Sequence, residues 1–352
     1  MNMFINEELK RYSRQISLPE IGLSGQEKLK QARVLMIGAG GLGCPVLQYL
    51  VGAGVGKIGI VDDDHVDISN LHRQILFSTE DVGSLKATTA KRKLEQLNPH
   101  AEITAYPARF TAEDAKSLCA DYDLLIDGSD NFETRYLVND TAVALNKPLV
   151  FGSILKFEGQ VSVFNYQGGP DYRDVFPEPP SAADVPNCAE AGVLGVLPGI
   201  MGSYMANEAI KIICGIGEVL SGQLLLMNTL DNTTRIFRFS KQKATKHTAN
   251  PAAKRPAENL NQEISQAKLN AWLLETPESV FIIDVRESYE FEEQNIGGIN
   301  IPLYNLGERV DELPLDKKLV FCCRSGQRSK MAIQLLKPLV EAEMYSLSYD
   351  NI

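Results

Sequence analysis

The chain has 352 residues, which is enough for two domains with a sizeable buried core. Its composition, 44% hydrophobic and 23% charged residues, is ordinary for a globular protein, and no run approaches the roughly 20 apolar residues that cross a bilayer. The net charge of -10 argues against a general binder of nucleic acid or of anionic membranes. Because the N-terminus also lacks the apolar core of a signal peptide, we expect a cytoplasmic protein with neither kind of partner.

Strands and helices alternate along the first 155 residues. Strands are expected at 33–37, 57–62, 101–108, 122–130 and 147–155, and helices at 42–54, 85–97, 112–119 and 132–144. This alternation is typical of a mainly parallel α/β sheet with helices on both faces. Further segments predict antiparallel strands around a helix at 197–214; they are 159–166, 222–229 and 234–240.

Two shifts in composition interrupt this pattern. Residues 241–262 are rich in Lys, Ala, Asn and Pro, and Leu260 is their single large apolar residue, so they predict an interdomain linker. We therefore expect one domain at 1–240 and another at 263–352. Residues 166–186 are dense in Gly and Pro and predict a long mobile loop.

The first strand runs into a glycine turn. Gly38 permits the tight turn, Gly40 lets the backbone approach a ligand, and Gly43 lets the following helix pack closely. The free N–H groups at the start of that helix suit an anion. Asp62 ends the second strand, where an acidic side chain binds ribose hydroxyls. Together these features indicate a Rossmann-like site for a nucleotide with a free ribose.

The glycine pattern alone favours NAD, but the residues that follow favour a triphosphate. Asn70 and Arg73 come just after the acidic strand, and Lys86 begins a helix. A reaction that splits a triphosphate needs fixed cations to stabilise the charge on the phosphorus and on the departing pyrophosphate. Each cation alone is more often a solvated surface charge. An NAD-dependent oxidoreductase and a non-catalytic scaffold therefore remain alternatives.

Several motifs, at matching spacing over roughly residues 9–239, resemble the MoeB/ThiF family of adenylyltransferases, which are related to ubiquitin-activating enzymes. The matching segments are 11–16, 38–45, 54–74, 82–87, 98–100, 126–136 and 188–195. The resemblance implies ATP-dependent adenylation of the C-terminal glycine of a ubiquitin-like sulfur carrier protein that ends in Gly-Gly.

The resemblance also implies which residues form the site. Those that would contact ATP are Gly38, Gly40, Gly41, Gly43, Asp62, Asn70, Arg73, Lys86, Asp130 and Asn131. Asp130 would also hold Mg²⁺, a hard ion that prefers carboxylate and phosphate oxygens. Arg14 would reach the phosphates from the other subunit of a homodimer.

The sequence departs from the family at the zinc site. The family uses two CxxC pairs, but Asp171 and Asp174 stand where one pair belongs, and residues 241–248, which follow strand 234–240, contain no cysteine. We therefore expect no zinc, and we interpret both aspartates as solvated loop charges. Cys188 matches a family cysteine; it is either a nucleophile or a bystander.

The second domain has a cysteine at the end of a strand. Cys323 precedes a charged turn and a helix, with Arg324, Gly326 and Arg328 around it. Such surroundings lower the pKa of a thiol and stabilise a thiolate or persulfide. Strand alternation directs Cys322 to the other side, into the core.

Segments 280–303 and 317–336 resemble a rhodanese domain, an α/β sulfurtransferase. Four residues separate Cys323 from Arg328, one fewer than in phosphatases, which favours sulfur over phosphate as the bound group. Asp284 and Arg286 are interpreted as structural support. The sequence stops soon after the last expected strand, where the family continues with another helix, so we expect weak sulfurtransferase activity.

The two domains predict one reaction sequence. The first would activate the carrier's C-terminus, and a persulfide on Cys323, supplied by an external sulfur donor, would convert the adenylate to a thiocarboxylate and release AMP. We expect this product to serve molybdopterin synthesis, with thiamine thiazole synthesis and tRNA thiolation as alternatives.

Overall fold

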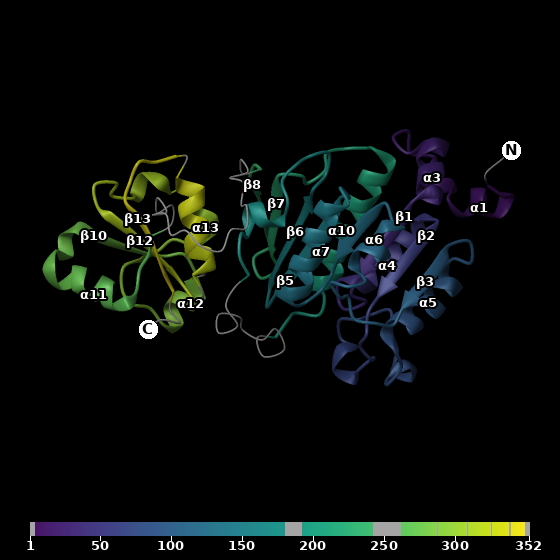
Figure 1. Ribbon diagram of the computed structural model, residues 1–352, viewed down its shortest axis with the longest axis horizontal. Coiled ribbons are helices and arrows are strands. Elements are labelled where there is room, and N and C mark those ends of the chain that lie inside the picture. The colour runs from purple at the N-terminus through teal and green to yellow at the C-terminus, as the bar shows by residue number, and fades with distance from the viewer. Residues whose placement is uncertain are drawn as a thin grey trace. The chain divides into compact units, whose positions relative to one another are not determined.

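The computed structural model describes residues 4–179, 192–241 and 262–348, apart from 287, 308, 325 and 338. Among these, 4–179 and 192–241 form one compact unit, and 262–348 form a second (Figure 1). Cys188 and the expected linker, apart from its end residues 241 and 262, lie outside the described residues.

An eight-stranded sheet forms the centre of the first unit. Its strands are β1 (Arg33–Ile37), β2 (Lys57–Val61), β3 (Glu102–Tyr106), β4 (Leu124–Asp127), β5 (Leu149–Leu155), β6 (Glu158–Phe164), β7 (Gln223–Asn228) and β8 (Thr233–Arg238). Their order is β3-β2-β1-β4-β5-β6-β7-β8; the first five are parallel and the last three antiparallel. This arrangement confirms the predicted α/β fold with added antiparallel strands.

Helices cover both faces of this sheet. They are α1 (Asn6–Arg11), α2 (Ser13–Ile16), α3 (Gly22–Gln31), α4 (Gly43–Ala53), α5 (Lys86–Leu97), α6 (Ala115–Ala120), α7 (Phe132–Ala144), α8 (Tyr172–Val175) and α10 (Leu197–Cys214). Val34 and Met36 of β1 lie in one core cluster with residues of α4, α5 and α10, whereas Leu35 between them is buried on the other face. Burial on both faces explains the continuous apolar run in β1.

The expected loop at 166–186 contains a helix, α8, within its described part. Asp171 and Asp174 form a capping box there: Asp171 Oδ1 accepts the Arg173 N–H at 2.7 Å, and Asp174 Oδ2 accepts the Asp171 N–H at 2.8 Å. Their interpretation as solvated loop charges was therefore wrong, because both satisfy backbone donors at the helix start. The cap places Tyr172 in an aromatic cluster with Phe151 and Phe164.

The second unit is a small parallel α/β domain. Its five strands, in sheet order β11-β10-β12-β13-β9, are flanked by three α-helices among the described residues. The strands are β9 (Gln262–Glu263), β10 (Val280–Asp284), β11 (Ile299–Asn300), β12 (Lys318–Cys323) and β13 (Met344–Ser348); the helices are α11 (Gln266–Glu275), α12 (Ser288–Glu293) and α13 (Gln327–Leu336). Cys322 and Cys323 belong to different core clusters, on opposite faces of β12.

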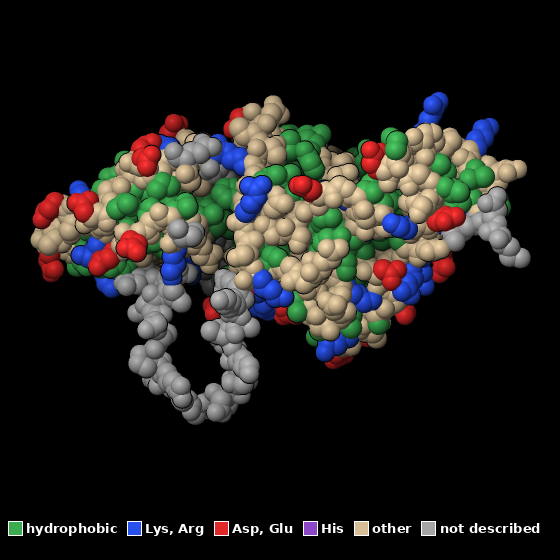
Figure 2. Space-filling model, turned by 90° about the horizontal axis from the view of Figure 1, so that it is seen from above, with side chains coloured by type: hydrophobic (Ala, Val, Ile, Leu, Met, Phe, Trp, Pro, Cys, Tyr) green, Lys and Arg blue, Asp and Glu red, His purple; other side chains and the backbone are tan. Residues whose placement is uncertain are grey.

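Three cysteines of the first unit lie among the described residues. Cys44, Cys119 and Cys214 are all buried, and burial raises the pKa of Cys44 and of Cys119 to about 12. None of the helices in the described ranges is long and apolar enough to cross a bilayer. On the face that Figure 2 shows, acidic and basic side chains are interspersed and not gathered by sign.

A buried carboxylate braces the segment before α5. Asp81, 4% exposed, accepts the Ser78 N–H at 2.8 Å and pairs with Lys93 at 2.6 Å and with Arg92 at 2.7 Å. Burial by itself raises the pKa of this carboxyl, but the hydrogen bonds and charges of Lys93 and Ser78 outweigh it and lower the pKa to about 2. Because the carboxylate form is the one stabilised, its contribution is present above the ordinary pKa of 3.8 and is lost as the pH falls toward 2.

We expect Asp81→Asn to lower the free energy of unfolding at pH 7 by about 2 kcal/mol, because charge-assisted hydrogen bonds are lost in a buried site. The difference from the unsubstituted protein should shrink as the pH falls from 4 to 2. Urea unfolding followed by circular dichroism measures it. Fluorescence of the single tryptophan, Trp272 in α11, follows the second unit and serves as an internal control. The urea concentration at the midpoint of its transition should be the same in the variant and in the unsubstituted protein. A difference that stays constant down to pH 2 would contradict this account.

Candidate active site

Three loops of the first unit meet at the carboxyl ends of β1, β2 and β4. Ile37, the last residue of β1, is paired in register with Val61 of β2 and with Asp127 of β4. Beyond it, the Gly38 N–H donates to the Val61 carbonyl at 2.9 Å, and the Gly128 N–H donates to the Ile37 carbonyl at 3.0 Å. The glycine turn, Asp62 and the 128–131 segment therefore lie side by side, at the edge where such sheets bind ligands.

The glycines of the turn differ in what surrounds them. A Cβ on Gly43 would lie 2.1 Å from the Gly38 carbonyl oxygen, and a Cβ on Gly38, at φ +90°, would lie 3.0 Å from the Gly128 oxygen. Gly41 packs against Pro198 of α10. At Gly40 the nearest atom to a Cβ is Gln74 Nε2, at 3.8 Å. Gly38 and Gly43 are therefore required by packing, whereas the space at Gly40 is open to a ligand.

Asp62 is held against this turn. Its Oδ2 accepts the Ala39 N–H at 2.7 Å, and its Oδ1 accepts the Asp64 N–H at 2.9 Å. Burial raises the pKa of its carboxyl, while these N–H donors and the charge of Lys86 oppose the rise. The carboxylate is thus fixed beside the backbone that would face a bound nucleotide.

The two expected cations of the first unit lie in different settings. Lys86, the first residue of α5, has a side chain only 7% exposed, and its Nζ contacts Asp64 Oδ2 at 2.9 Å. Arg73 is half-buried; its Nη1 donates to the Ser69 carbonyl at 3.2 Å, and its stem packs on Gly41. The Asn70 carbonyl accepts the Arg73 N–H at 3.0 Å. Sequence reasoning missed Asp64, although it lies two residues after Asp62.

The segment after β4 presents Asp130 to solvent. Asp130 is exposed, and Asn131 beside it caps α7 by accepting the Thr134 N–H at 2.9 Å. Arg14 is exposed on α2.

Gln74, which sequence reasoning also missed, bears on the fit of a nucleotide. It is 4% exposed, and its Oε1 has no hydrogen-bond partner among the described residues. The Gln74 side chain borders the open space at Gly40, and a nucleotide bound there could supply the missing hydrogen-bond partner. The residues present therefore fit ATP.

The described side chains include no group of three or more His, Cys, Asp and Glu that could hold a metal ion by themselves. The exposed carboxylate of Asp130 is a hard oxygen ligand that could hold Mg²⁺ together with the phosphates of a nucleotide. The absence of zinc stays a prediction.

In the second unit, Cys323 ends β12 immediately before the turn that leads into α13. Its thiol is buried, the Ser329 N–H donates to Sγ at 3.3 Å, and the Ser329 hydroxyl lies 3.4 Å from Sγ. That hydroxyl also contacts the Ser346 hydroxyl of β13 at 2.8 Å. Gly326, at φ +79°, begins the helix. A hydrogen-bonded sulfur at a helix start suits a thiolate or persulfide.

The two arginines of the expected persulfide loop differ in their surroundings. Arg328 makes two hydrogen bonds to Glu290 of α12, at 2.5 and 2.9 Å, so a carboxylate engages it in this structure. Arg324 is exposed, and its carbonyl accepts the Ser348 hydroxyl at 2.7 Å.

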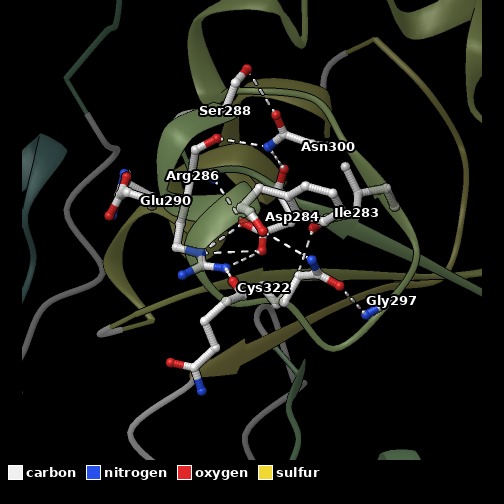
Figure 3. Close-up of polar contacts among 12 residues, drawn as sticks. Ile283, Asp284, Arg286, Ser288, Glu290, Gly297, Asn300 and Cys322 are labelled. Atoms are coloured by element: carbon white, nitrogen blue, oxygen red, sulfur yellow. Dashed lines mark hydrogen bonds and ion pairs between the residues drawn. The ribbon is translucent and has the colours of Figure 1, made fainter.

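Asp284 ends β10, where it pairs in register with Cys322 of β12. Figure 3 shows the Arg286 side chain beside it; the guanidinium donates to both carboxylate oxygens, and the shortest contact is 2.6 Å. The Asn300 amide donates to the Asp284 and Arg286 carbonyls, at 3.0 and 2.8 Å. This buried pair has the geometry of structural support.

These features define the class: a Rossmann-like nucleotide-binding domain with basic residues at its ligand edge, joined in one chain to a domain with a hydrogen-bonded cysteine. A model of the ThiF family matches residues 12–249, and a model of the rhodanese-like domain matches residues 265–351. The chain therefore belongs to the ThiF family and carries a rhodanese-like domain, which confirms both predicted resemblances.

Some relatives match both parts of the chain, and others match about two thirds of it. The probable adenylyltransferase/sulfurtransferase MoeZ of Mycobacterium tuberculosis is 43% identical over 352 aligned positions, covering 94% of this chain and 88% of the relative. The sulfur carrier protein adenylyltransferase of Thermus thermophilus is 56% identical over 234 positions, covering 65% and 86%. The probable molybdopterin-synthase adenylyltransferase of Pyropia yezoensis is 44% identical over 339 positions, covering 94% and 89%. The chain is thus an adenylyltransferase with a sulfurtransferase domain, as predicted.

Solved structures agree on the fold of the first unit. Escherichia coli MccB with ATP superimposes with a TM-score of 0.59 at 22% identity, covering 66% of this chain and 72% of MccB. PaaA superimposes with a TM-score of 0.59 at 24% identity, covering 69% and 76%. At these identities the likeness concerns the fold.

The glycine turn yields a paired prediction. Gly43→Ala should destabilise the first unit by about 3 kcal/mol or more, because its methyl group would clash with a backbone carbonyl. Gly40→Ala should leave stability unchanged but weaken ATP binding at least about tenfold, because the methyl group enters the space of the ligand. Gly52→Ala is the control: its Cβ would meet nothing within 4 Å, so neither property should fall. Calorimetric titration measures the affinity for ATP, and thermal unfolding measures the stability. Unchanged ATP binding in the Gly40→Ala variant would refute the assignment of this space to the nucleotide.

Proposed function

We propose that this enzyme adenylates the C-terminal glycine of a ubiquitin-like sulfur carrier protein and then transfers sulfur to it from a persulfide on Cys323. The resulting thiocarboxylate would serve molybdopterin synthesis, in line with the relatives named as molybdopterin-synthase adenylyltransferases. The observation that carries the proposal is the meeting of the glycine turn, Asp62 and the Asp130 segment at one sheet edge.

In the first step the carrier's carboxylate attacks the α-phosphorus of ATP and pyrophosphate leaves. Asp62 would hold the ribose, and the backbone of the glycine turn would face the phosphates. Arg73 and Lys86 would stabilise the charge that develops during this step. Lys86 must exchange Asp64 for phosphate, because the two are paired in this structure. Asp130 would hold Mg²⁺, which neutralises phosphate charge when bound.

In the second step the outer sulfur of the Cys323 persulfide attacks the acyl carbon, and AMP leaves. The product is an acyl disulfide, in which the carrier is joined to Cys323 through two sulfurs. Attack of another thiol on the sulfur of Cys323 then releases the thiocarboxylate and leaves a disulfide. Cys188 is a candidate for this thiol. The Ser329 N–H would stabilise the Cys323 sulfur whenever it carries negative charge.

The assembly follows from the same assignment. Residues 241–262 would tether the rhodanese domain, so that sulfur is delivered at high effective concentration. Arg14 would complete the phosphate site of a second copy in a homodimer. An external thiol would first reduce the disulfide and free the Cys323 thiol, and an external persulfide would then reload it.

The adenylation half predicts ATP–pyrophosphate exchange that depends on a carrier ending in Gly-Gly. Arg73→Ala and Asp130→Ala should each reduce exchange at least about 100-fold, because each removes stabilisation of phosphate charge. Arg33→Ala is the control, since Arg33 begins β1 at the end opposite to the glycine turn. Isotope exchange measures all three. Full exchange in the Arg73 or Asp130 variant would overturn the site assignment.

The sulfur half predicts that Cys323→Ala abolishes persulfide formation from thiosulfate, because the accepting sulfur is gone. Cys322→Ala is the matched control: it removes the neighbouring buried thiol on the other face of β12 and should retain persulfide formation. Mass spectrometry of the intact chain distinguishes the two. A persulfide on the Cys323→Ala variant would move the role to another cysteine.

A further inference from the structure

A buried polar cluster lies directly before Asp130 in the sequence and in the fold. It consists of Asp127 at the end of β4, Ser129, and Arg135 of α7, all at least nine-tenths buried. Each has a buried polar atom without a hydrogen-bond partner among the described residues: Asp127 Oδ2, Ser129 Oγ and Arg135 Nε. Asp127 Oδ2 and Arg135 Nε are 4.0 Å apart, which is too long for a hydrogen bond.

Such a pair is a poor device for stability. Removing both charges from water is costly, and incomplete hydrogen bonding leaves much of that cost uncompensated. Burial raises the pKa of the Asp127 carboxyl, and the charge of Arg135 opposes that rise. The pair therefore calls for another role.

Within the described part of the chain, two hydrogen bonds of the pair go to the backbone of Ser129. Asp127 Oδ1 accepts the Ser129 N–H at 2.9 Å, and Arg135 Nη2 donates to the Ser129 carbonyl at 3.2 Å. The peptide groups on both sides of Ser129 are thus held, and the second of them leads into Asp130. On the other side, Asn131 is fixed as the cap of α7. Asp130 itself stays exposed between two anchored neighbours.

Arg135 is in turn held by aromatic rings. Its guanidinium carbon lies 5.1 Å from the ring centre of Phe132 and 5.1 Å from that of Phe151. At this distance the ring faces attract a cation. The position of the Arg135 guanidinium is therefore fixed by its neighbours, and the side chain is not free to move onto a ligand.

We propose that Arg135, together with Asp127, is a positioning residue that fixes the Ser129–Asp130 peptide and so sets the Asp130 carboxylate for Mg²⁺ and nucleotide. This inference rests on the proposed function, because it requires Asp130 to bind the metal. Binding groups must be held within fractions of an ångström by the residues behind them, so a loosened loop should weaken metal use before it unfolds the protein.

The test is the Mg²⁺ concentration that gives half-maximal ATP–pyrophosphate exchange in the full chain. Arg135→Met should raise it about tenfold, whereas Arg135→Lys, which keeps a donor for the Ser129 carbonyl, should raise it about two- to threefold. Arg109→Met is the matched control: this exposed arginine pairs with Glu133 of α7, and its loss should leave the Mg²⁺ requirement unchanged. Thermal unfolding of each variant is followed in parallel.

The outcomes separate the two proposals. If Asp130→Asn does not change the Mg²⁺ requirement, the metal assignment in the proposed function is wrong. If Asp130→Asn raises it but folded Arg135→Met does not, Arg135 has only a structural role and the present inference fails. If Arg135→Met does not fold, the Arg135→Lys variant decides the question. If its Mg²⁺ requirement equals that of the unsubstituted enzyme, the inference is overturned.

Discussion

The parallel register of β1 between β2 and β4 is the constraint on which the nucleotide site depends. It aligns Ile37 with Val61 and Asp127, so the glycine turn, Asp62 and the Asp130 segment leave the sheet at one edge. The close approach of α4 completes this arrangement, because Gly43 lets the helix begin against the Gly38 carbonyl. A residue larger than glycine there would separate helix and sheet and widen the site.

In the first unit, the positions of individual buried charges matter more for the site than the net charge of the chain. The chain as a whole is acidic, yet Lys86 lies in a nearly buried position, where its Nζ is paired with an exposed partner, Asp64. In the proposed reaction, phosphate would replace Asp64 as the partner of Lys86, so the buried cation would stay paired. The cluster of Asp127 and Arg135 uses buried charge differently, to hold backbone in place.

In the second unit, the alternation of side chains along β12 separates two adjacent cysteines. Cys322 packs in one core cluster, and Cys323 lies on the opposite face beside Ser329. Because successive side chains of a strand point to opposite faces of the sheet, two neighbouring cysteines lie in different environments. The carboxylate of Glu290 on Arg328 is a feature that the loop sequence does not reveal, because it comes from a separate helix.

The sequence by itself determined most of the alternating strands and helices of the first unit, the strand and helix around Cys323, the glycine turn and the acidic residue after β2, because each depends on local periodicity, turn chemistry and short spacing. It also determined the family, through motifs in order along the chain. Expected strand ends at 108 and 130 extended beyond the observed ones, Tyr106 and Asp127, and at Asp127 the reason is that the chain turns into the 128–131 segment of the site. Only the tertiary structure decided that Asp171 and Asp174 cap a helix, that Asp64 holds Lys86 and that Arg135 braces the segment before Asp130. Except for the cap, these contacts join residues from separate elements, and no local pattern records which distant side chain fills a buried space.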